Sequence, residues 1–291
     1  MRRRPDVLTV ILRRVAFGFP IAVVLVAAVN AVAFAGFDPY TRGTVGYDFS
    51  YPQCGTAAPT ASFGIVGVNA GYPFTYYNSC LAAEFAAAAK TGNAAVYINT
   101  GYDPTYTAID GRHTKQDCAN KSVNVIGSQA QKAAWAVGCS EAERDTAYLR
   151  ESRSGGEAGA STQSVASPTA WWLDVEIANS WSSSDLTLNQ YTIQGIVATL
   201  RQTTAAPIGI YSTSYQWSVI TGGYKAAVDA NWVGTGQSTL KKAKAYCASS
   251  GFTGAKIWLV QYVATFDRDY VCKGAEDTRP RNGDLQASSG K

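Results

Sequence analysis

The chain has 291 residues, of which 46% are hydrophobic, so it is long enough for one large barrel-type domain or two smaller domains, each with a core. Its formal net charge of +4 arises in the first 35 residues, because the rest of the chain carries 20 basic and 20 acidic residues. With no basic excess left, the composition argues against nucleic-acid binding and gives no support for electrostatic steering to an anionic surface.

The N-terminal segment has the pattern of a secretory signal peptide. Five arginines precede an apolar run over 15–35, which ends in Ala33-Phe34-Ala35. Small residues at these positions favour cleavage after Ala35. The alternative is an uncleaved membrane anchor, because about 20 apolar residues can span a bilayer. We expect a signal peptide at 1–35, a linker at 36–43, a single domain at 44–272 and a disordered polar tail at 273–291.

Eight short apolar segments have the composition of buried strands. In chain order they are 44–50, 63–69, 94–99, 171–176, 207–211, 231–234, 256–262 and 266–271. Helical patterns occupy 81–90, 127–137, 140–151, 188–200, 215–220 and 240–248, whereas 107–126 reads as irregular. This alternation predicts an α/β fold with a parallel sheet. Eight strands favour a closed (β/α)8 barrel of the TIM-barrel type over a doubly wound sheet, and no Gly-x-Gly-x-x-Gly motif follows the first strand.

The cysteines support export. Six cysteines in an exported chain predict three disulfides, in any of fifteen connectivities. Closeness in sequence favours the pairs Cys54 with Cys80, Cys118 with Cys139, and Cys247 with Cys272. Since no two cysteines have C-x-x-C spacing and the single His113 sits in a polar loop, we expect no metal and no cofactor.

The most informative stretch is 171–176, which reads Trp-Trp-Leu-Asp-Val-Glu. Side chains alternate along a strand, so Trp172, Asp174 and Glu176 should share one face. Carboxylates in an apolar strand are costly to desolvate, which points to a paired or a chemical role. The alternative is a strand end whose acids are solvated or salt-bridged.

In a barrel of this kind the carboxyl ends of the strands meet on one face, where functional residues gather. Asp48, Asp174, Glu176 and either Asp267 or Asp269 fall at or near that end. Aromatic residues of the neighbouring strand ends and loops would bind substrate: Tyr72, Tyr76, Tyr102, Trp181, Tyr211 and Tyr262. Aromatic rings beside paired acids suit a sugar site, because pyranose faces stack on rings and glycosidic cleavage uses two carboxyl groups.

Several motifs together resemble glycoside hydrolase family 25, the exported lysozyme-like barrels, and a glycoside-hydrolase-like branch of secreted bacterial proteins. The resemblance covers about 44–272, and it is carried by 46–50 (Gly-Tyr-Asp-Phe-Ser), 63–66, 173–176 (Leu-Asp-Val-Glu), 209–212 and 261–262. It implies a muramidase that cleaves the β-1,4 bond of peptidoglycan. Glu176 would be the general acid, Asp174 would stabilise the N-acetyl group or activate water, and Asp48 and Asp269 would shape the site.

Two other readings stay open at this point. A barrel that keeps the acids but binds wall glycan without cutting it would be a non-catalytic binding protein. An uncleaved N-terminal segment would instead give an anchored structural protein of the envelope, and a membrane contact arises only in that case. We expect a monomer that is secreted to the extracellular space or the cell envelope and has peptidoglycan as its partner.

Overall fold

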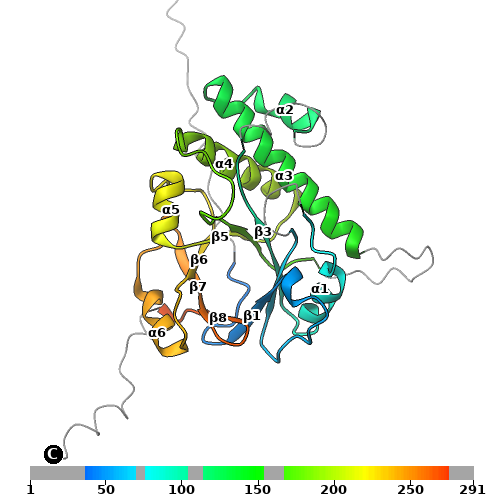
Figure 1. Cartoon of the computed structure of the whole chain (residues 1–291), viewed down its shortest axis with the longest axis vertical. Helices are drawn as coiled ribbons and strands as arrows, with labels where there is room; N and C mark the ends of the chain where they lie inside the picture. The colour runs from blue at the N-terminus through cyan, green and yellow to red at the C-terminus, as the bar shows by residue number, and fades with distance from the viewer. Residues whose placement is uncertain (1–36, 70–75, 104–113, 154–166, 275–291) are drawn as a thin grey trace, which may run out of the picture. The chain divides into compact units, whose positions relative to one another are not determined.

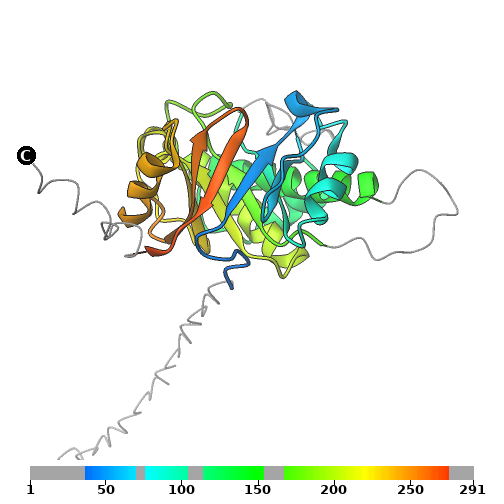
Figure 2. The same cartoon turned by 90° about the horizontal axis from the view of Figure 1, so that it is seen from below.

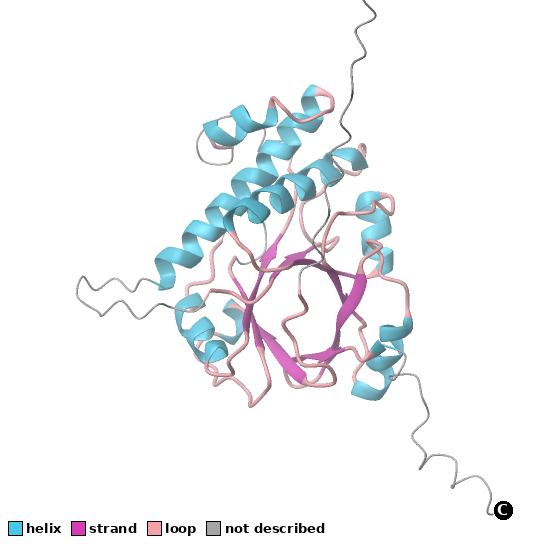
Figure 3. Ribbon diagram, turned by 180° about the vertical axis from the view of Figure 1, so that it is seen from behind, coloured by secondary structure: helices cyan, strands magenta, loops and turns pink. Residues whose placement is uncertain are grey.

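The structure is a computed structural model that describes residues 37–69, 76–103, 114–153 and 167–274. The predicted signal peptide and nearly all of the predicted tail lie outside these residues. Eight strands form one closed barrel in the order of the sequence (Figure 1). Figure 3 shows the ring of strands with the helices outside it. The predicted closed α/β barrel is therefore confirmed.

The strands and helices lie close to their predicted positions. The strands are β1 (Val45–Phe49), β2 (Gly64–Gly67), β3 (Ala94–Asn99), β4 (Trp171–Asp174), β5 (Ile208–Ser212), β6 (Ala230–Gly234), β7 (Lys256–Val263) and β8 (Asp267–Val271). The helices are α1 (Leu81–Ala89), α2 (Gln116–Ser122), α3 (Gln129–Arg153), α4 (Leu186–Thr203), α5 (Ser214–Thr221) and α6 (Leu240–Lys244). Short 3-10 turns lie at Tyr51–Gln53 and Ala245–Ala248.

The last strand departs from the predicted parallel sheet. β8 pairs antiparallel with both β7 and β1, and Figure 2 shows β1 and β8 side by side. Only residues 264–266 join β7 to β8, which is enough for a hairpin but far too short for the crossover that a parallel pair requires. The start of β8, rather than its end, therefore lies at the rim where the first seven strands finish.

Two apolar clusters place the core on both sides of the sheet. Trp172 is fully buried in the cluster that fills the barrel, where its indole donates a hydrogen bond to the Tyr40 hydroxyl at 2.9 Å. Trp171 and Leu173 belong to the cluster between barrel and helices. β4 thus alternates as predicted, with Trp172 and Asp174 turned inward.

The region before β4 contains more helix than predicted. The two segments expected at 127–137 and 140–151 form one helix, α3, and the second half of the stretch 107–126, expected to be irregular, contains α2. Gly138 does not end α3, because it serves close packing: a Cβ there would collide with the backbone of Thr192 on α4. Gly195 on α4 has the same relation to the Trp135 carbonyl. The glycines thus let the two helices approach closely.

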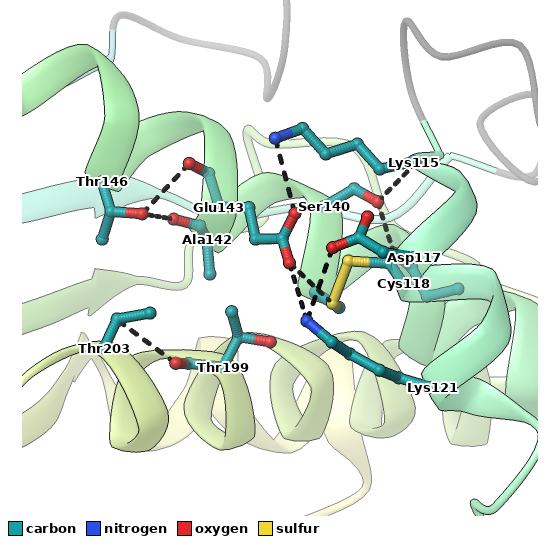
Figure 4. Close-up of polar contacts among 12 residues, drawn as sticks. Lys115, Asp117, Cys118, Lys121, Ser140, Ala142, Glu143, Thr146, Thr199 and Thr203 are labelled. Carbon is teal, nitrogen blue, oxygen red and sulfur yellow. Dashed lines mark hydrogen bonds and ion pairs between the residues drawn. A yellow bond between two sulfur atoms is a disulfide. The ribbon is translucent and has the colours of Figure 1, made fainter. Parts of the chain in front are cut away.

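Covalent and ionic links attach α2 to α3 (Figure 4). The Cys118–Cys139 disulfide joins the helices, and Lys121 forms an ion pair with Glu143 at 3.0 Å. The Lys115 backbone N–H donates to the Ser140 hydroxyl at 2.9 Å. The excursion between β3 and β4 therefore packs as an extension of the α3–α4 layer.

All six cysteines are paired, and no helix of the described residues is long and apolar enough to cross a membrane. The disulfides are Cys54–Cys80, Cys118–Cys139 and Cys247–Cys272. These are the pairs that closeness in sequence favours. Three disulfides are typical of proteins that fold in an oxidising compartment.

Candidate active site

A cavity of about 310 Å³ opens at the rim where β1 to β7 end. Side chains from seven strands, together with Glu176 just beyond β4, line it: Asp48, Tyr97, Asp174, Glu176, Tyr211, Trp232, Gln261 and Asp267. Three of the four predicted catalytic acids are among them. The cavity is thus polar, rich in carboxyl groups and walled by aromatic rings.

Asp174 and Glu176 both lie at the C-terminal end of β4. Asp174 is the last residue of the strand and is 7% exposed, and its Oδ1 finds no hydrogen-bond partner among the described residues. Burial raises the pKa of Asp174 well above its usual range, and the nearby Glu176 and Asp48 raise it further. Both effects favour the protonated form of Asp174, in which the carboxyl group can donate a hydrogen bond. Glu176 lies just past the strand and is partly exposed at the cavity.

Asp48 and Asp269 form a second acidic pair. Burial and the charge of Asp267 raise the pKa of Asp48 to about 7, although a hydrogen bond from Gln261 (Nε2 to Oδ2, 3.1 Å) acts in the opposite direction. Asp269 is fully buried, and burial and the adjacent Asp48 raise its pKa well above its usual range. Burial and mutual repulsion therefore both oppose the simultaneous ionisation of the two carboxyl groups. Such a pair can shape the field of the cavity without the cost of two buried charges.

A chain of hydrogen bonds ties this pair to the opposite wall. The Tyr211 hydroxyl donates to the Gln261 Oε1 at 2.8 Å, and Gln261 in turn donates to Asp48. Because the Tyr211 O–H occupies the amide oxygen, the amide NH2 must face the carboxyl group. Burial, followed by the surrounding carboxylates, raises the pKa of Tyr211 well above its usual range, so the phenol stays protonated as a donor.

The two candidate acids of the last strand occupy different depths. Asp267, the first residue of β8, lines the cavity, and burial raises its pKa. Asp269, which was predicted to shape the site, lies two residues further along β8 and faces the barrel interior below the cavity. It does not line the cavity, but it interacts with Asp48, which does. The order reflects the reversed direction of β8, since its N-terminal end lies at the rim.

Of the six aromatic residues predicted to bind substrate, Tyr211 lines the cavity. Tyr102 is buried at 3% exposure, Tyr262 packs against the outer core cluster, and Tyr76 is 61% exposed but does not line the cavity. Trp181 packs against the outer cluster and donates its indole N–H to the Glu176 carbonyl oxygen at 2.8 Å, which holds the backbone beside the acid. The remaining one, Tyr72, lies outside the described residues.

Three lining residues were not predicted: Tyr97, Trp232 and Gln261. The inward position of Tyr97 follows from strand alternation, because Tyr97 lies two residues after Ala95 and on the same face of β3. In the β3–β4 register, Tyr97 pairs with the inward-facing Trp172. The inward direction of the Gln261 side chain could not be predicted, because the register shifts between β6 and β7. Asn231 pairs with Ile257, but Trp232 pairs with Leu259. A bulge of this kind inverts the alternation, so that Gln261 faces inward and Tyr262 outward.

The described residues contain one cluster with metal-ligand geometry, and it lies away from the cavity lining. It consists of Cys118, Cys139 and Glu143, whose two sulfur atoms are joined in the disulfide. The cavity itself presents carboxyl groups, phenols, an amide and an indole. Carboxyl groups in two protonation environments supply what acid-catalysed cleavage of a glycosidic bond requires.

Comparison with known families identifies a lysozyme-like region. The model of the family described as lysozyme-like protein 1 matches residues 158–257, which include β4 with both Asp174 and Glu176 and extend to the start of β7. The lysozyme-like resemblance is thereby confirmed over these residues. No curated protein matches the chain.

Several solved structures are similar to the chain at low sequence identity. A muramidase from Trichobolus zukalii is 16% identical, with 84% of this chain and 97% of that chain covered and a TM-score of 0.46. The bacterial lysozyme from Streptomyces coelicolor is 18% identical, with 81% and 95% covered and a TM-score of 0.48. A family GH25 lysozyme from Aspergillus fumigatus is 14% identical, with 84% and 97% covered and a TM-score of 0.44.

Proposed function

We propose that this chain, lysozyme-like over residues 158–257, is a secreted glycoside hydrolase that cleaves the β-1,4 glycan of peptidoglycan by carboxyl acid–base chemistry. The observation that carries the proposal is the cavity in which Glu176, Asp174 and Asp48 meet at the rim of the barrel. Glycan cleavage needs two carboxyl groups that flank the bond in different protonation states.

Glu176 is the proposed general acid, which protonates the leaving glycosidic oxygen. It stands beyond the end of β4 and is partly exposed, so a glycan in the cavity can reach its carboxyl group. Its backbone is fixed, since the Glu176 carbonyl oxygen accepts hydrogen bonds from the Trp181 indole at 2.8 Å and the Asn179 N–H at 3.0 Å. A fixed backbone limits the volume that the carboxyl group can sample and favours a productive geometry.

Asp174 is proposed as the partner that orients the substrate. A neutral carboxyl group donates a hydrogen bond, so Asp174 can bind the N-acetyl carbonyl oxygen of the sugar or position a water molecule. Asp48 and Asp267, on the far side of the cavity, would contribute negative charge near the developing oxocarbenium ion. Asp269 would set how much charge Asp48 carries.

The proposed setting is outside the cytoplasm, with cell-wall glycan as the partner. The three disulfides support an oxidising compartment, and the predicted signal peptide at 1–35 would provide export. The predicted domain 44–272 contains the whole barrel from β1 to β8. The protein would act on the wall as a monomer.

The test is to incubate residues 36–291, oxidised, with purified peptidoglycan and to measure new reducing ends. The Glu176→Gln variant should lose about 10²- to 10⁴-fold in rate, the usual contribution of a general acid. Glu143→Gln is the matched control, because Glu143 forms ion pairs on α3 with the partly exposed Lys115 and Lys121. Such exposed pairs contribute about 1 kcal/mol or less, so this variant should keep wild-type activity.

The result also separates the catalytic reading from the binding reading. Reducing ends released by wild type and the control, but not by Glu176→Gln, support the hydrolase. Wild-type protein that sediments with peptidoglycan and releases no reducing ends would refute it and leave a non-catalytic wall-binding barrel.

A further inference from the structure

Gln216 stands in the first turn of α5, directly beside the proposed general acid. Thr213 caps this helix by accepting a hydrogen bond from the Gln216 backbone N–H at 3.0 Å. The next residue, Trp217, is 1% exposed, packs on Phe252 with ring centroids 5.5 Å apart, and donates its indole N–H to the Tyr224 carbonyl oxygen at 2.9 Å. The turn that carries Gln216 is therefore anchored on both sides.

The hydrogen bonds of Gln216 fix which way its amide group points. The Ile177 backbone N–H donates to the Gln216 Oε1 at 2.7 Å. Because a backbone N–H can only donate, the amide oxygen must occupy that position. The amide NH2 is thus directed toward Glu176, with 3.4 Å between Nε2 and the carboxylate Oε1.

This arrangement makes Gln216 a bridge between the backbone after Glu176 and the Glu176 side chain. Trp181 and Asn179 hold the backbone carbonyl group of Glu176, but they do not constrain its carboxyl group. Among the described residues, Gln216 supplies the side-chain hydrogen bond to that carboxyl group. The bond therefore limits the positions that the carboxyl group can take.

We propose that Gln216 is a positioning residue, which holds the Glu176 carboxyl group toward the cavity. The inference rests on the proposed function, because it assigns a role in that same reaction. Gln216 does not line the cavity and acts through Glu176. A residue of α5, the helix that follows β5, thereby positions the general acid that follows β4.

Three variants test the proposal in the oxidised protein acting on purified peptidoglycan. Gln216→Met keeps the length of the side chain and removes both hydrogen bonds. Gln216→Glu keeps the acceptor for the Ile177 N–H and replaces the donor with a like charge. Gln190→Met is the matched control, since Gln190 also donates to α5, at the Thr221 carbonyl oxygen (2.8 Å), but at the far end of the helix from the cavity.

The pH dependence of kcat is the readout that a merely structural role would not move. A general acid must be protonated, so activity falls on the alkaline side as Glu176 ionises. Gln216→Glu should move this alkaline limb upward by about one pH unit, because a neighbouring negative charge favours the protonated acid. Gln216→Met should lower kcat about tenfold and leave KM within about twofold, because the carboxyl group loses its positioning hydrogen bond. Gln190→Met should match wild type.

NMR titration of the carboxyl groups in ¹³C-Glu-labelled protein, with the Glu176 signal assigned by its loss in Glu176→Gln, should show that Glu176 keeps its proton to higher pH in Gln216→Glu than in wild type without substrate. An active wild type whose alkaline limb and kcat are unchanged in both Gln216 variants overturns the role of Gln216 and leaves the proposed function standing. Lower activity in Gln216→Met that only follows a smaller folded fraction, together with an unmoved limb in Gln216→Glu, overturns it as well. A wild type that releases no reducing ends overturns the proposed function itself, which is a different result.

Discussion

Gly209 on β5 provides the space that Trp172 fills inside the barrel. The two residues are direct neighbours in the β4–β5 register. A Cβ atom added at Gly209 would lie 2.5 Å from Cε3 and 2.9 Å from Cη2 of the Trp172 ring, and closer still to Cζ3. Ordinary contacts of this type begin at 3.4 Å, so the ring would have to retreat by about 1 Å.

The Trp172 ring has little freedom to retreat. It is fully buried, its Nε1 donates to the Tyr40 hydroxyl at 2.9 Å, and the rings of Trp232 and Trp258 pack edge-on at 5.7 and 6.4 Å between centroids. Overpacking of a filled core costs about 1–3 kcal/mol, and we expect Gly209→Ala to lie at the upper end. Since Asp174 follows two residues later on the same strand face, activity on peptidoglycan should fall as well.

Urea unfolding followed by far-UV circular dichroism would measure the cost, with an unchanged slope against urea as the check on two-state behaviour. Trp172→Phe supplies the compensating change, because the smaller ring vacates the space that the new methyl group needs. The double variant should be more stable than the sum of the two single costs predicts, by at least about 1 kcal/mol. Strict additivity within about 0.5 kcal/mol would refute the steric argument.

Two further predictions concern the buried acids and the α2 excursion. Asp48 and Asp269 bind protons more tightly in the folded chain than in the unfolded chain, so stability should fall as pH rises from about 4, where unfolded carboxyl groups titrate, through about 7, the pKa of folded Asp48. Urea unfolding at pH 5 and pH 8 should show this loss in wild type and a smaller loss in Asp269→Asn; equal losses in both proteins would contradict the assignment. The double variant Cys118→Ser/Cys139→Ser removes a crosslink with a sequence separation of 21, worth at most about 3 kcal/mol. Limited proteolysis should cut α2 faster while peptidoglycan cleavage changes little. An unchanged proteolysis rate would show that the noncovalent contacts with α3 are enough to hold α2.

The sequence was sufficient for the barrel because its strands are short apolar runs separated by helical patterns. It also placed Asp174 and Glu176 at one site, since the alternation along β4 puts Trp172 and Asp174 on the same face. The parallel strands β1 and β5 end at the same rim, so Asp48 and Tyr211 also lie there. These predictions depended on local periodicity, which the tertiary structure preserved.

The predictions that missed depended on contacts between distant segments. The gap expected between 127–137 and 140–151 is absent, and the role of Gly138 in that gap is set by Thr192 on another helix. Whether Gln261 or Tyr262 faces the cavity depends on the bulge between β6 and β7, which no pattern within β7 reveals. Gln216 lies in a helix rather than at the end of a strand, and its relevance appears only when α5 is placed beside Glu176.

The reversed direction of β8 determines where the barrel can be attached to something else. β1 starts, and β8 finishes, on the side of the barrel away from the cavity. Hydrogen bonds join the two ends there, from the Gly43 N–H to the Val271 carbonyl oxygen and from the Val271 N–H to the Thr44 carbonyl oxygen. With eight parallel strands the chain would leave the barrel on the cavity side instead. A tether, tag or second domain fused before Gly43 or after Cys272 would therefore emerge at the base of the barrel, and the mouth would stay open to a polymer as large as a cell wall.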